Sequence, residues 1–338
     1  MASWASLALA CLLAMPWQAE AQSLPPVAKP RLTACPAPPK PVRDLAIPRF
    51  YANAEGSTID PKLAKLHEAA VAPLVEFLRA MVDAADKAVV RRNPEQVACA
   101  LDWLQAWASA DAWLGDMVTR QAEYQRKWDL AGIGLAYVKL RPYATREQRA
   151  VIEPWLKRWA AVARTFFDNP ERKRNNHWYW LGLGIMATAV ATDSPEHWQA
   201  ARGIYEDALK DIRADGVLPH EMERQERGLF YHVFAMTPLV VMAEMAAQRG
   251  ETWYDAHDGA LHRLVGLCLD GLEKPQAFEA LAGKLQEQPV NARAGWLSLY
   301  RSRFPERVGR RTLPSVPDKH RWLGGDVRLL MQAVASSR

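Results

Sequence analysis

Residues 60–81 read DPKLAKLHEAAVAPLVEFLRAM, and the fold prediction starts from this stretch. Asp60 followed by Pro61 is a typical helix start, because the first helical position does not use the N–H that proline lacks. Apolar residues then recur at helical spacing, at Leu63, Leu66, Ala70, Leu74, Phe77 and Met81. Such a stripe predicts an amphipathic helix with one face turned toward a core.

Similar segments fill the rest of the chain, at residues 94–116, 121–141, 145–167, 177–192, 195–213, 221–248, 255–272, 290–304 and 324–336. No segment shows the alternation of a convincing strand, and no motif recurs at the fixed period of a solenoid. Short polar turns such as Ala214-Asp215-Gly216 and Gln248-Arg249-Gly250 join the segments. We therefore expect an all-α fold of helical hairpins packed side by side. A closed or nearly closed α/α toroid, an incomplete α/α barrel, fits residues 60–338 as one domain.

The N-terminus is typical of an exported protein. Residues 1–21 contain an apolar stretch from Leu7 to Met15 and end in Ala19-Glu20-Ala21, a small-x-small cleavage site, which predicts a signal peptide. Residues 22–59 are rich in proline and lack periodicity, so we expect an extended arm. The mature protein should be periplasmic or secreted, after cleavage near Ala21.

Three cysteines would remain after cleavage, Cys35, Cys99 and Cys268. An oxidising compartment allows one disulfide. Cys35–Cys99 is the preferred pair, because Cys35 lies in the Pro-rich arm, which needs tethering. Cys268 lies in an apolar helical run and is expected to be a buried thiol.

The charge balance indicates the kind of partner. The formal net charge is +5 over 338 residues, and no nucleic-acid-binding motif is present. For an exported protein this favours a polyanion outside the cytoplasm, such as an acidic polysaccharide. Beyond the signal peptide no segment has eighteen uninterrupted apolar residues, so a membrane span is not expected.

The run NNHWYW at residues 175–180 says most about chemistry. Asn176 and His177 fall at the start of a predicted helix, where an asparagine is a natural cap. One interpretation is therefore a capping Asn beside an ordinary His. The other is a functional pair, with Trp178, Tyr179 and Trp180 as flat surfaces on which sugars stack, although such a tryptophan-rich helix is also typical of a core.

Arg224 and Tyr231 are seven residues apart on what is predicted to be one helix, so they share a face. Gly228 lies between them on that face and would leave room for a sugar ring. The alternative is a solvated Arg224 paired with Glu221 and a half-buried Tyr231.

Other motifs fail. His220-Glu221 begins like a helical zinc site, but residue 224 is Arg where a second His is required. Gly182-x-Gly184 has no strand before it, and the serines lack a nucleophile elbow. Nothing in the spacing of Asp215, Glu221 and Glu223 demands a glycosidase pair. We expect neither a metal nor a cofactor.

Several motifs resemble the mannuronate-specific alginate lyases of polysaccharide lyase family 5. The central ones are Asn175-Asn176-His177-x-Tyr179-Trp180, Met186 to Thr192, Gly216-x-Leu218-Pro219 and Arg224-Gln225-x-Arg227-x-Leu229-x-Tyr231-His232. Others flank them, at Cys99 to Leu104, Arg126-Lys127-Trp128, Gly259 to Leu264 and Leu323 to Val327. The resemblance runs from about Cys35 to the C-terminus.

This resemblance implies an α/α toroid with a deep substrate cleft and a metal-independent β-elimination of a polyuronate. Asn176 and Arg224 would hold and neutralise the substrate carboxylate. His177 would act on the C5 proton, and Tyr231 would donate a proton to the leaving O4. In a second version Tyr231 is both base and acid, with His177 in support. We expect an arginine to lower the pKa of a nearby tyrosine.

The resemblance also implies a set of sugar contacts, at Arg126, Trp128, Tyr179, Arg293 and Trp296. Trp178 is unusual for the family, and we expect it to alter substrate choice. Mannuronate-rich alginate is the expected substrate, with polyglucuronate or mixed polyuronates as alternatives. The expected partner is thus an anionic polysaccharide, bound by a monomer. A non-catalytic polyuronate-binding protein and a hydrolase are the rival functions.

Overall fold

The computed structural model describes residues 35–287 and 295–336. The predicted signal peptide, residues 1–21, lies outside the described residues, as does the start of the arm. The described chain is dominated by helices, whose bounds are α1 Pro61–Val89, α2 Pro94–Ser109, α3 Arg120–Leu140, α4 Arg146–Phe167, α5 Asn176–Ala191, α6 Pro195–Asp211, α7 Pro219–Met222, α8 Gly228–Gln248, α9 Ala256–Glu273, α10 Pro275–Ala282, α11 Trp296–Arg303, α12 Pro305–Val308 and α13 Val327–Ser336. The all-α prediction is confirmed.

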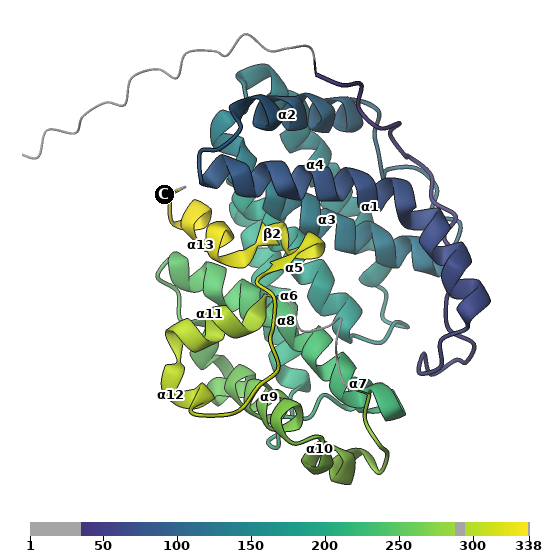
Figure 1. The fold of residues 1–338 in the computed structure, drawn as a ribbon, viewed down its shortest axis with the longest axis vertical. Coiled ribbons are helices and arrows are strands. Elements are labelled where there is room, and N and C mark those ends of the chain that lie inside the picture. Colours follow the sequence, from purple (N-terminus) through teal and green to yellow (C-terminus); the bar gives the residue numbers. More distant parts are fainter. Residues whose placement is uncertain (1–34, 288–294, 337–338) are drawn as a thin grey trace, which may run out of the picture. The chain divides into compact units, whose positions relative to one another are not determined.

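The helices form two layers (Figure 1). In the inner layer α1 packs on α3, α3 on α5 and α5 on α8. In the outer layer α2 packs on α4, and α6 on α9, while hairpin contacts join α1 to α2, α3 to α4 and α5 to α6. α13 contacts α1, α3 and α8. This is the predicted α/α toroid of helical hairpins.

Burial explains which helices are inner. α4, in the outer layer, is apolar on one side only, as expected of a helix with one face in solvent, and α1, although it packs in the inner layer, also keeps one face exposed. α5 and α8 are apolar all round and are buried on nearly every side. The stretch Gln225–Gln248 is long and apolar enough to cross a membrane, but 89% of its apolar window is buried inside the fold, so it is a core helix.

Some predicted bounds are wrong. The predicted helix at 94–116 ends at Ser109, because Asp111 and Trp113 adopt left-handed backbone angles (φ 51° and 59°). The segment that follows pairs with the arm, where the Leu45 N–H donates to the Asp116 carbonyl at 2.8 Å. The sequence also gives no sign of the short helices α10 and α12, or of the two-residue strands β1 (Lys319–His320) and β2 (Gly325–Asp326).

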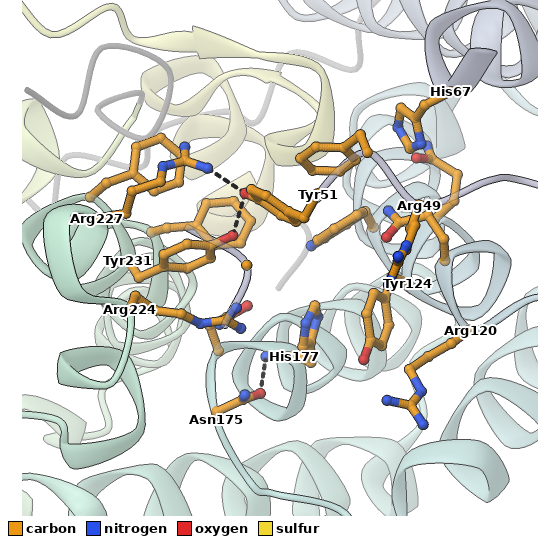
Figure 2. A pocket seen from close by; sticks show the side chains of 18 of the residues that line it. Arg49, Tyr51, His67, Arg120, Tyr124, Asn175, His177, Arg224, Arg227 and Tyr231 are labelled. Carbon is orange, nitrogen blue, oxygen red and sulfur yellow. Dashed lines mark hydrogen bonds between the residues drawn. The ribbon is translucent and has the colours of Figure 1, made fainter. Parts of the chain in front are cut away.

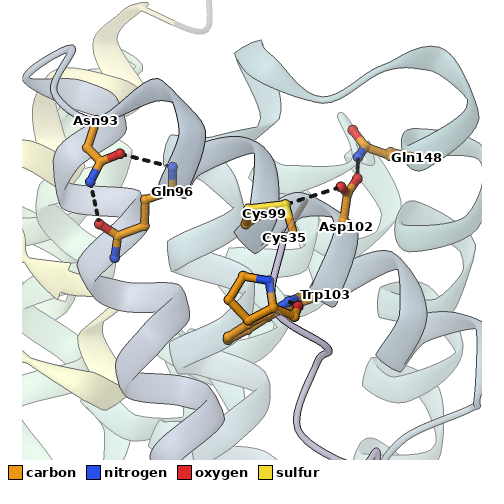
Figure 3. The surroundings of a disulfide bond; sticks show 8 residues. Cys35, Asn93, Gln96, Cys99, Asp102, Trp103 and Gln148 are labelled. Atoms are coloured by element: carbon orange, nitrogen blue, oxygen red, sulfur yellow. Dashed lines mark hydrogen bonds between the residues drawn. A yellow bond between two sulfur atoms is a disulfide. The ribbon is translucent and has the colours of Figure 1, made fainter. Parts of the chain in front are cut away.

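The predicted disulfide and the predicted thiol are both confirmed. Cys35 is bonded to Cys99 in α2 (Figure 3), and Cys268 is free and buried. The arm then follows α2, where Trp103 and Trp107 donate their indole N–H groups to the carbonyls of Pro36 and Pro39. These bonds direct the arm along the domain toward residues 49–59.

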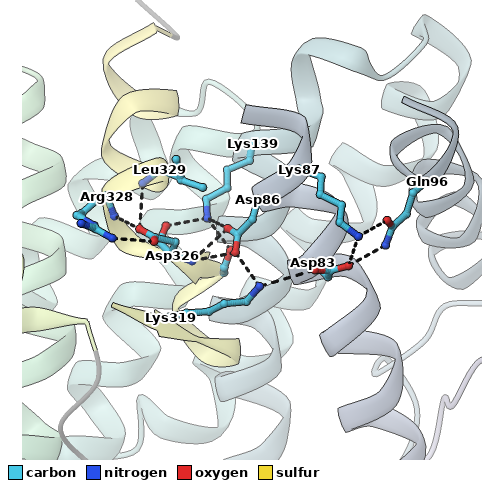
Figure 4. Close-up of polar contacts among 10 residues, drawn as sticks. Asp83, Asp86, Lys87, Gln96, Lys139, Lys319, Asp326, Arg328 and Leu329 are labelled. Atoms are coloured by element: carbon cyan, nitrogen blue, oxygen red, sulfur yellow. Dashed lines mark hydrogen bonds and ion pairs between the residues drawn. The ribbon is translucent and has the colours of Figure 1, made fainter. Parts of the chain in front are cut away.

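A buried ion cluster holds the C-terminal segment against the ring (Figure 4). Lys139 of α3 donates to the Asp86 carboxylate at 2.7 Å and to the carbonyls of Gly324 and Asp326, each at 2.9 Å. Lys319 pairs with Asp86 at 3.0 Å. Gly325 has φ +105°, and a side chain there would overlap with Asp86. The cluster therefore fixes the position of residues 319–326, which include Arg321 and Trp322.

Candidate active site

A large cleft opens among the arm, α3, α5, the segment before α8, and the segment 317–322 that contains Arg321 and Trp322. Its volume is about 1450 Å³. Eight basic residues line it against four acidic ones: Arg49, Arg120, Arg172, Lys173, Arg224, Arg227, Lys319 and Arg321 against Glu55, Glu68, Glu171 and Glu223. A concave wall with this excess of positive charge attracts anions. Except for Arg224, sequence reasoning assigned none of these eight to the site, because they come from segments far apart in the chain.

His177 lies in the first turn of α5 and faces the cleft (Figure 2). It is the one residue of α5 that is not buried. The cap of this helix is Asn175, whose side chain accepts the His177 backbone N–H at 3.1 Å, so the cap lies one residue before the predicted Asn176. His177 therefore lies in the first turn of α5, and Asn175, two residues before it, caps this helix.

The His177 ring is stacked on the Tyr124 ring, with centroids 3.7 Å apart. Its Nδ1 is buried and has no hydrogen-bond partner. Burial, together with the positive charges of Lys127, Arg224 and Arg120, holds the pKa of His177 well below its usual range. The imidazole is therefore neutral at neutral pH and can accept a proton.

Asn176 lies in the cleft wall but is itself covered, with 0% of its surface exposed. Its amide Nδ2 donates to the Glu221 carboxylate, lying 3.0 Å from each oxygen, and its backbone N–H donates to Oε1 at 2.7 Å. Glu221 thus pairs with Asn176, and not with Arg224 as the alternative interpretation of Arg224 had it. Burial raises the pKa of Glu221.

Arg224 and Tyr231 meet in the cleft, but not on one helix. α7 ends at Met222, Gln225 has φ 51°, and α8 begins only at Gly228. The prediction of one helix over 221–248 is wrong, because this break lets the chain turn across the cleft wall. The guanidinium of Arg224 lies 4.4 Å from the centroid of the Tyr231 ring, and its Nη1 donates to the Glu55 carbonyl at 2.7 Å.

Gly228 does not leave room for a sugar. A side chain at this position would meet Phe278 and Gln286, each at 3.2 Å, and Met222, so Gly228 faces protein and not the cleft. The break before α8 has rotated it away from the face that Arg224 and Tyr231 share with the cleft.

Tyr231 is bound by Tyr51 of the arm, a residue that sequence reasoning missed. The two hydroxyls are 2.6 Å apart, and Arg227 also donates to the Tyr51 hydroxyl (Figure 2). Burial and the neighbouring Tyr51 raise the pKa of Tyr231, against the lowering effect of Arg224 and Arg227. The arginines therefore lower this pKa as expected, but burial outweighs them and the net shift is upward. Tyr231 keeps its proton and can donate it.

An aromatic wall continues from His177. Trp128 lines the cleft as predicted, and its ring is stacked on that of Trp322 with centroids 4.6 Å apart. Behind the wall, the Lys127 ammonium is 0% exposed and lies 3.7 Å from the Trp128 ring centroid. Burial lowers the pKa of Lys127 well below its usual range. Nothing in the sequence predicted that Trp322 and Lys127 would lie at the site.

Four of the other predicted sugar contacts lie away from the cleft. Trp178 (4% exposed), Tyr179 (1%) and Trp296 (0%) are core residues, and none of them lines the cleft. The Tyr179 hydroxyl donates to Asp211 at 2.9 Å. Trp178 and Tyr179 point away from His177 because successive helical residues are about 100° apart, and the rest of α5 is surrounded by other helices.

Arg126 is also buried and pairs with Glu123 one turn earlier in α3, at 2.5 Å. It does not line the cleft either. Arg293 lies outside the described residues. Of the predicted sugar contacts, the structure therefore brings Trp128 to the cleft with His177, Arg224 and Tyr231, and it leaves Trp178, Tyr179, Arg126 and Trp296 elsewhere.

Within residues 35–287 and 295–336, no three His, Cys, Asp or Glu side chains are grouped so that they could hold a metal ion. The chemistry available from the described side chains is thus a neutral imidazole, a protonated phenol and guanidinium groups. This set suits proton transfer next to an anion.

Comparisons with known proteins give one family. The family described as Alginate lyase matches residues 48–278. A polysaccharide lyase of Stenotrophomonas maltophilia is 40% identical over 276 residues, which cover 81% of this chain and 83% of the relative. An alginate lyase of Pseudomonas fluorescens is 36% identical over 248 residues, which cover 70% and 67%.

Solved structures agree with these sequences. Alginate lyase A1-III, in a complex with a tetrasaccharide, aligns with a TM-score of 0.76 and 26% identity, over 87% of this chain and 85% of that one. The structure of alginate lyase A1-III from Sphingomonas species A1 aligns with a TM-score of 0.71 over the same shares.

Proposed function

The chain belongs to the alginate lyase family and is a polysaccharide lyase, and from this premise we propose that it cleaves mannuronate-rich alginate by a β-elimination that needs no metal. The observation that carries the proposal is the meeting of three groups in one basic cleft. These are the neutral His177, the protonated Tyr231, and the Arg224 guanidinium 4.4 Å from the Tyr231 ring centroid.

In the proposed reaction the C5–H bond of the uronate at the cleavage site is broken and its electrons form a C4=C5 double bond. The C4–O4 bond breaks, and O4 leaves with a proton. The C5 proton is only weakly acidic until the adjacent carboxylate is paired, so a cation that binds the developing negative charge lowers the barrier; one such donor typically contributes about 2.7–4 kcal/mol. Arg224 has this role, with Asn176 beside it in the wall.

His177 accepts the C5 proton and Tyr231 donates a proton to O4. The pKa of His177 is held well below its usual range, so the imidazole is free to accept a proton. The pKa of Tyr231 is raised, so its hydroxyl is a proton donor. Each such group typically contributes about 10²- to 10⁴-fold. In the second version Tyr231 performs both transfers; this would require Tyr231 to lose its proton first, which its burial disfavours.

A tetrasaccharide is bound in the related alginate lyase A1-III, which supports a polysaccharide as the ligand of this cleft. The aromatic wall of Trp128 and Trp322 offers stacking surfaces for sugar rings. Mannuronate, polyglucuronate and mixed polyuronates all carry the carboxylate that Arg224 would bind. We propose mannuronate as the substrate because the motifs around residues 175–180 and 216–232 resemble those of mannuronate-specific lyases.

We also propose that the protein is exported, through the signal peptide at residues 1–21, and acts as a periplasmic or secreted monomer. The Cys35–Cys99 disulfide supports export, because such bonds persist in oxidising compartments. Mass analysis of the mature N-terminus and light scattering would test these two statements.

The test of function is the ultraviolet absorbance of the unsaturated product. The purified protein is incubated with polymannuronate, polyguluronate and polyglucuronate, beside its Tyr231→Phe variant. We expect absorbance to rise fastest with polymannuronate and to be nearly lost in the variant. A purely binding protein or a hydrolase would give no such absorbance from any of the three polymers, and that result would refute the lyase proposal.

A further inference from the structure

Glu221 is a buried carboxylate whose hydrogen bonds all go to one residue of the cleft wall. It is 0% exposed, and among the described residues no lysine or arginine forms an ion pair with it. Asn176 supplies both its backbone N–H, at 2.7 Å, and its amide Nδ2, 3.0 Å from each carboxylate oxygen. The two residues are 45 positions apart, so this contact joins α7 to the start of α5.

The start of α5 has a second cap besides this carboxylate. Asn175 already accepts the His177 backbone N–H with its side chain, and its carbonyl accepts the Trp178 N–H at 2.8 Å. A buried carboxylate with no direct ion pair is a costly way to cap a helix, even though a helix N-terminus favours negative charge. A neutral side chain would have served for helix stability alone.

What the carboxylate adds is control of the Asn176 amide. Equal distances from Nδ2 to the two oxygens direct one N–H between them, and a side-chain amide has two such donors at a fixed angle. Rotating the amide by half a turn would bring its oxygen against the carboxylate, so that orientation is excluded. The Asn176 Oδ1 is buried and has no partner, which shows that the amide is held by its nitrogen alone.

The same bonds fix the backbone before His177. The Asn176 N–H is bonded to Glu221 and the His177 N–H to Asn175. Two of the N–H groups that have no partner within this helix are therefore satisfied by side-chain oxygens of defined position. His177 follows directly and is the one residue of α5 that is not buried.

We propose that Glu221 is a positioning residue of the elimination site, which orients the Asn176 amide and, through the Asn176 backbone, places the His177 ring. This inference rests on the proposed function, because it assigns Glu221 to the same reaction. Glu221 does not line the cleft, and it acts through Asn176. Burial raises its pKa, against the lowering effects of the nearby Arg224 charge and of the N–H groups of Asn176.

The test is a double-mutant cycle with Glu221→Gln, Asn176→Ala and the double variant, assayed on the polyuronate that the parent cleaves fastest. Glu221→Gln keeps the shape, but an NH2 group replaces one of the two oxygens that the Asn176 Nδ2 contacts, so two donors face each other and the Asn176 side chain is pushed from its place. We expect kcat to fall by about 10²-fold with KM little changed, because misplacement of a reacting group by about 1 Å can cost that much. The double variant should be no slower than Asn176→Ala alone.

Glu226→Gln is the matched control. Glu226 lies five residues further on, its side chain has no hydrogen bond or ion pair among the described contacts, and it does not line the cleft. Its variant should keep the activity of the parent. A Glu221→Gln variant within about twofold of the parent, or losses that multiply in the double variant, would overturn the proposal.

Two further measurements make the outcome independent of folding and of the reaction. If Glu221→Gln is too unstable to assay, Glu221→Asp can replace it, because it keeps the carboxylate but retracts it by one methylene. The kcat of Glu221→Asp should be lower than that of the parent. An unchanged kcat would overturn the proposal. In a crystal structure of Glu221→Gln the Asn176 side chain and the His177 ring should be displaced from their places in the parent. If neither side chain moves, the inference is refuted, whether or not the parent cleaves a polyuronate; failure of the parent to cleave any polyuronate would refute the proposed function instead.

Discussion

The hydroxyl of Tyr51 lies 2.6 Å from the hydroxyl of Tyr231, although the two residues are 180 positions apart in the chain. Tyr51 belongs to the arm and Tyr231 to α8. Arg227 donates to the Tyr51 hydroxyl from the other side. The arm therefore completes the surroundings of the group proposed to protonate the leaving oxygen.

Removing the Tyr51 hydroxyl should slow the reaction. In Tyr51→Phe the Tyr231 hydroxyl loses its partner, and one net hydrogen bond is worth about 0.5–1.5 kcal/mol. We expect kcat/KM to fall roughly 3- to 10-fold, measured by product absorbance. Tyr143→Phe is the control, since Tyr143 bonds only the Ala88 carbonyl; equal rates for both variants would contradict a role for Tyr51.

A side chain at Gly56 should disturb Arg224. Gly56 has φ +68°, and a methyl group there would overlap with Nη1 of Arg224. Gly56→Ala should lose about 1 kcal/mol of stability through backbone strain and, in addition, about tenfold in kcat/KM. Gly283→Ala is the matched control: it has φ +65° and open space around it, so it should share the strain and keep the activity.

Two tryptophans should separate substrate binding from stability. Trp128→Ala removes part of the cleft wall and should raise KM about tenfold, a loss of about 1.4 kcal/mol in binding. Trp178→Phe should leave KM and substrate preference unchanged and should lower stability by about 1–3 kcal/mol, because Trp178 is a core residue. A change of substrate preference in Trp178→Phe would restore the original prediction for this residue.

The acid limit of activity should lie below the usual titration range of histidine. His177 has to be neutral to accept a proton, and burial with the charges of Lys127, Arg224 and Arg120 keeps its pKa well below 6.5. The kcat/KM profile should therefore stay flat as pH falls through 6.5. Lys127→Met removes one of the three charges and should move the acid limit to higher pH, while stability holds or rises, because a buried charge is replaced by an apolar side chain.

Acid should destabilise the fold through His232. Burial lowers the pKa of His232 from 6.5 to about 4, while its ring accepts the Leu218 N–H at 3.0 Å. Below pH 6.5 the unfolded chain takes up a proton that the folded chain refuses, so stability is full above 6.5 and is lost as pH falls toward 4. One such group contributes a slope of about 1.4 kcal/mol per pH unit.

Urea titrations between pH 7 and pH 4.5 would measure this slope. His232→Gln should flatten it, and His257→Gln, a change at an exposed residue, should leave it as in the parent. His177 and His320 also have lowered pKa values, so part of the slope should remain in His232→Gln. An unchanged slope in that variant would contradict the assignment.

Local patterns in the sequence predicted the fold well. The Asp60-Pro61 start, with the Asp60 side chain accepting the Lys62 and Leu63 N–H groups, and the apolar stripe after it led to the helical hairpins. The prediction failed where a long-range contact overrides propensity. Residues 110–116 leave the predicted helix to pair with the arm, and residues 223–227 leave the predicted helix to cross the cleft wall.

Residue patterns and the family resemblance predicted most of the helices, the pairing of Cys35 with Cys99, and His177, Arg224, Tyr231 and Trp128 as site residues. Only the tertiary structure decided which side chains share the cleft. It added Tyr51 and Trp322 to the cleft, placed Glu221 behind the cleft wall, and removed Trp178 and Trp296. The reason is physical: helical periodicity reports which face of one helix is apolar, whereas a site in a toroid is assembled from the ends of several helices and an arm, through contacts between residues far apart in the chain.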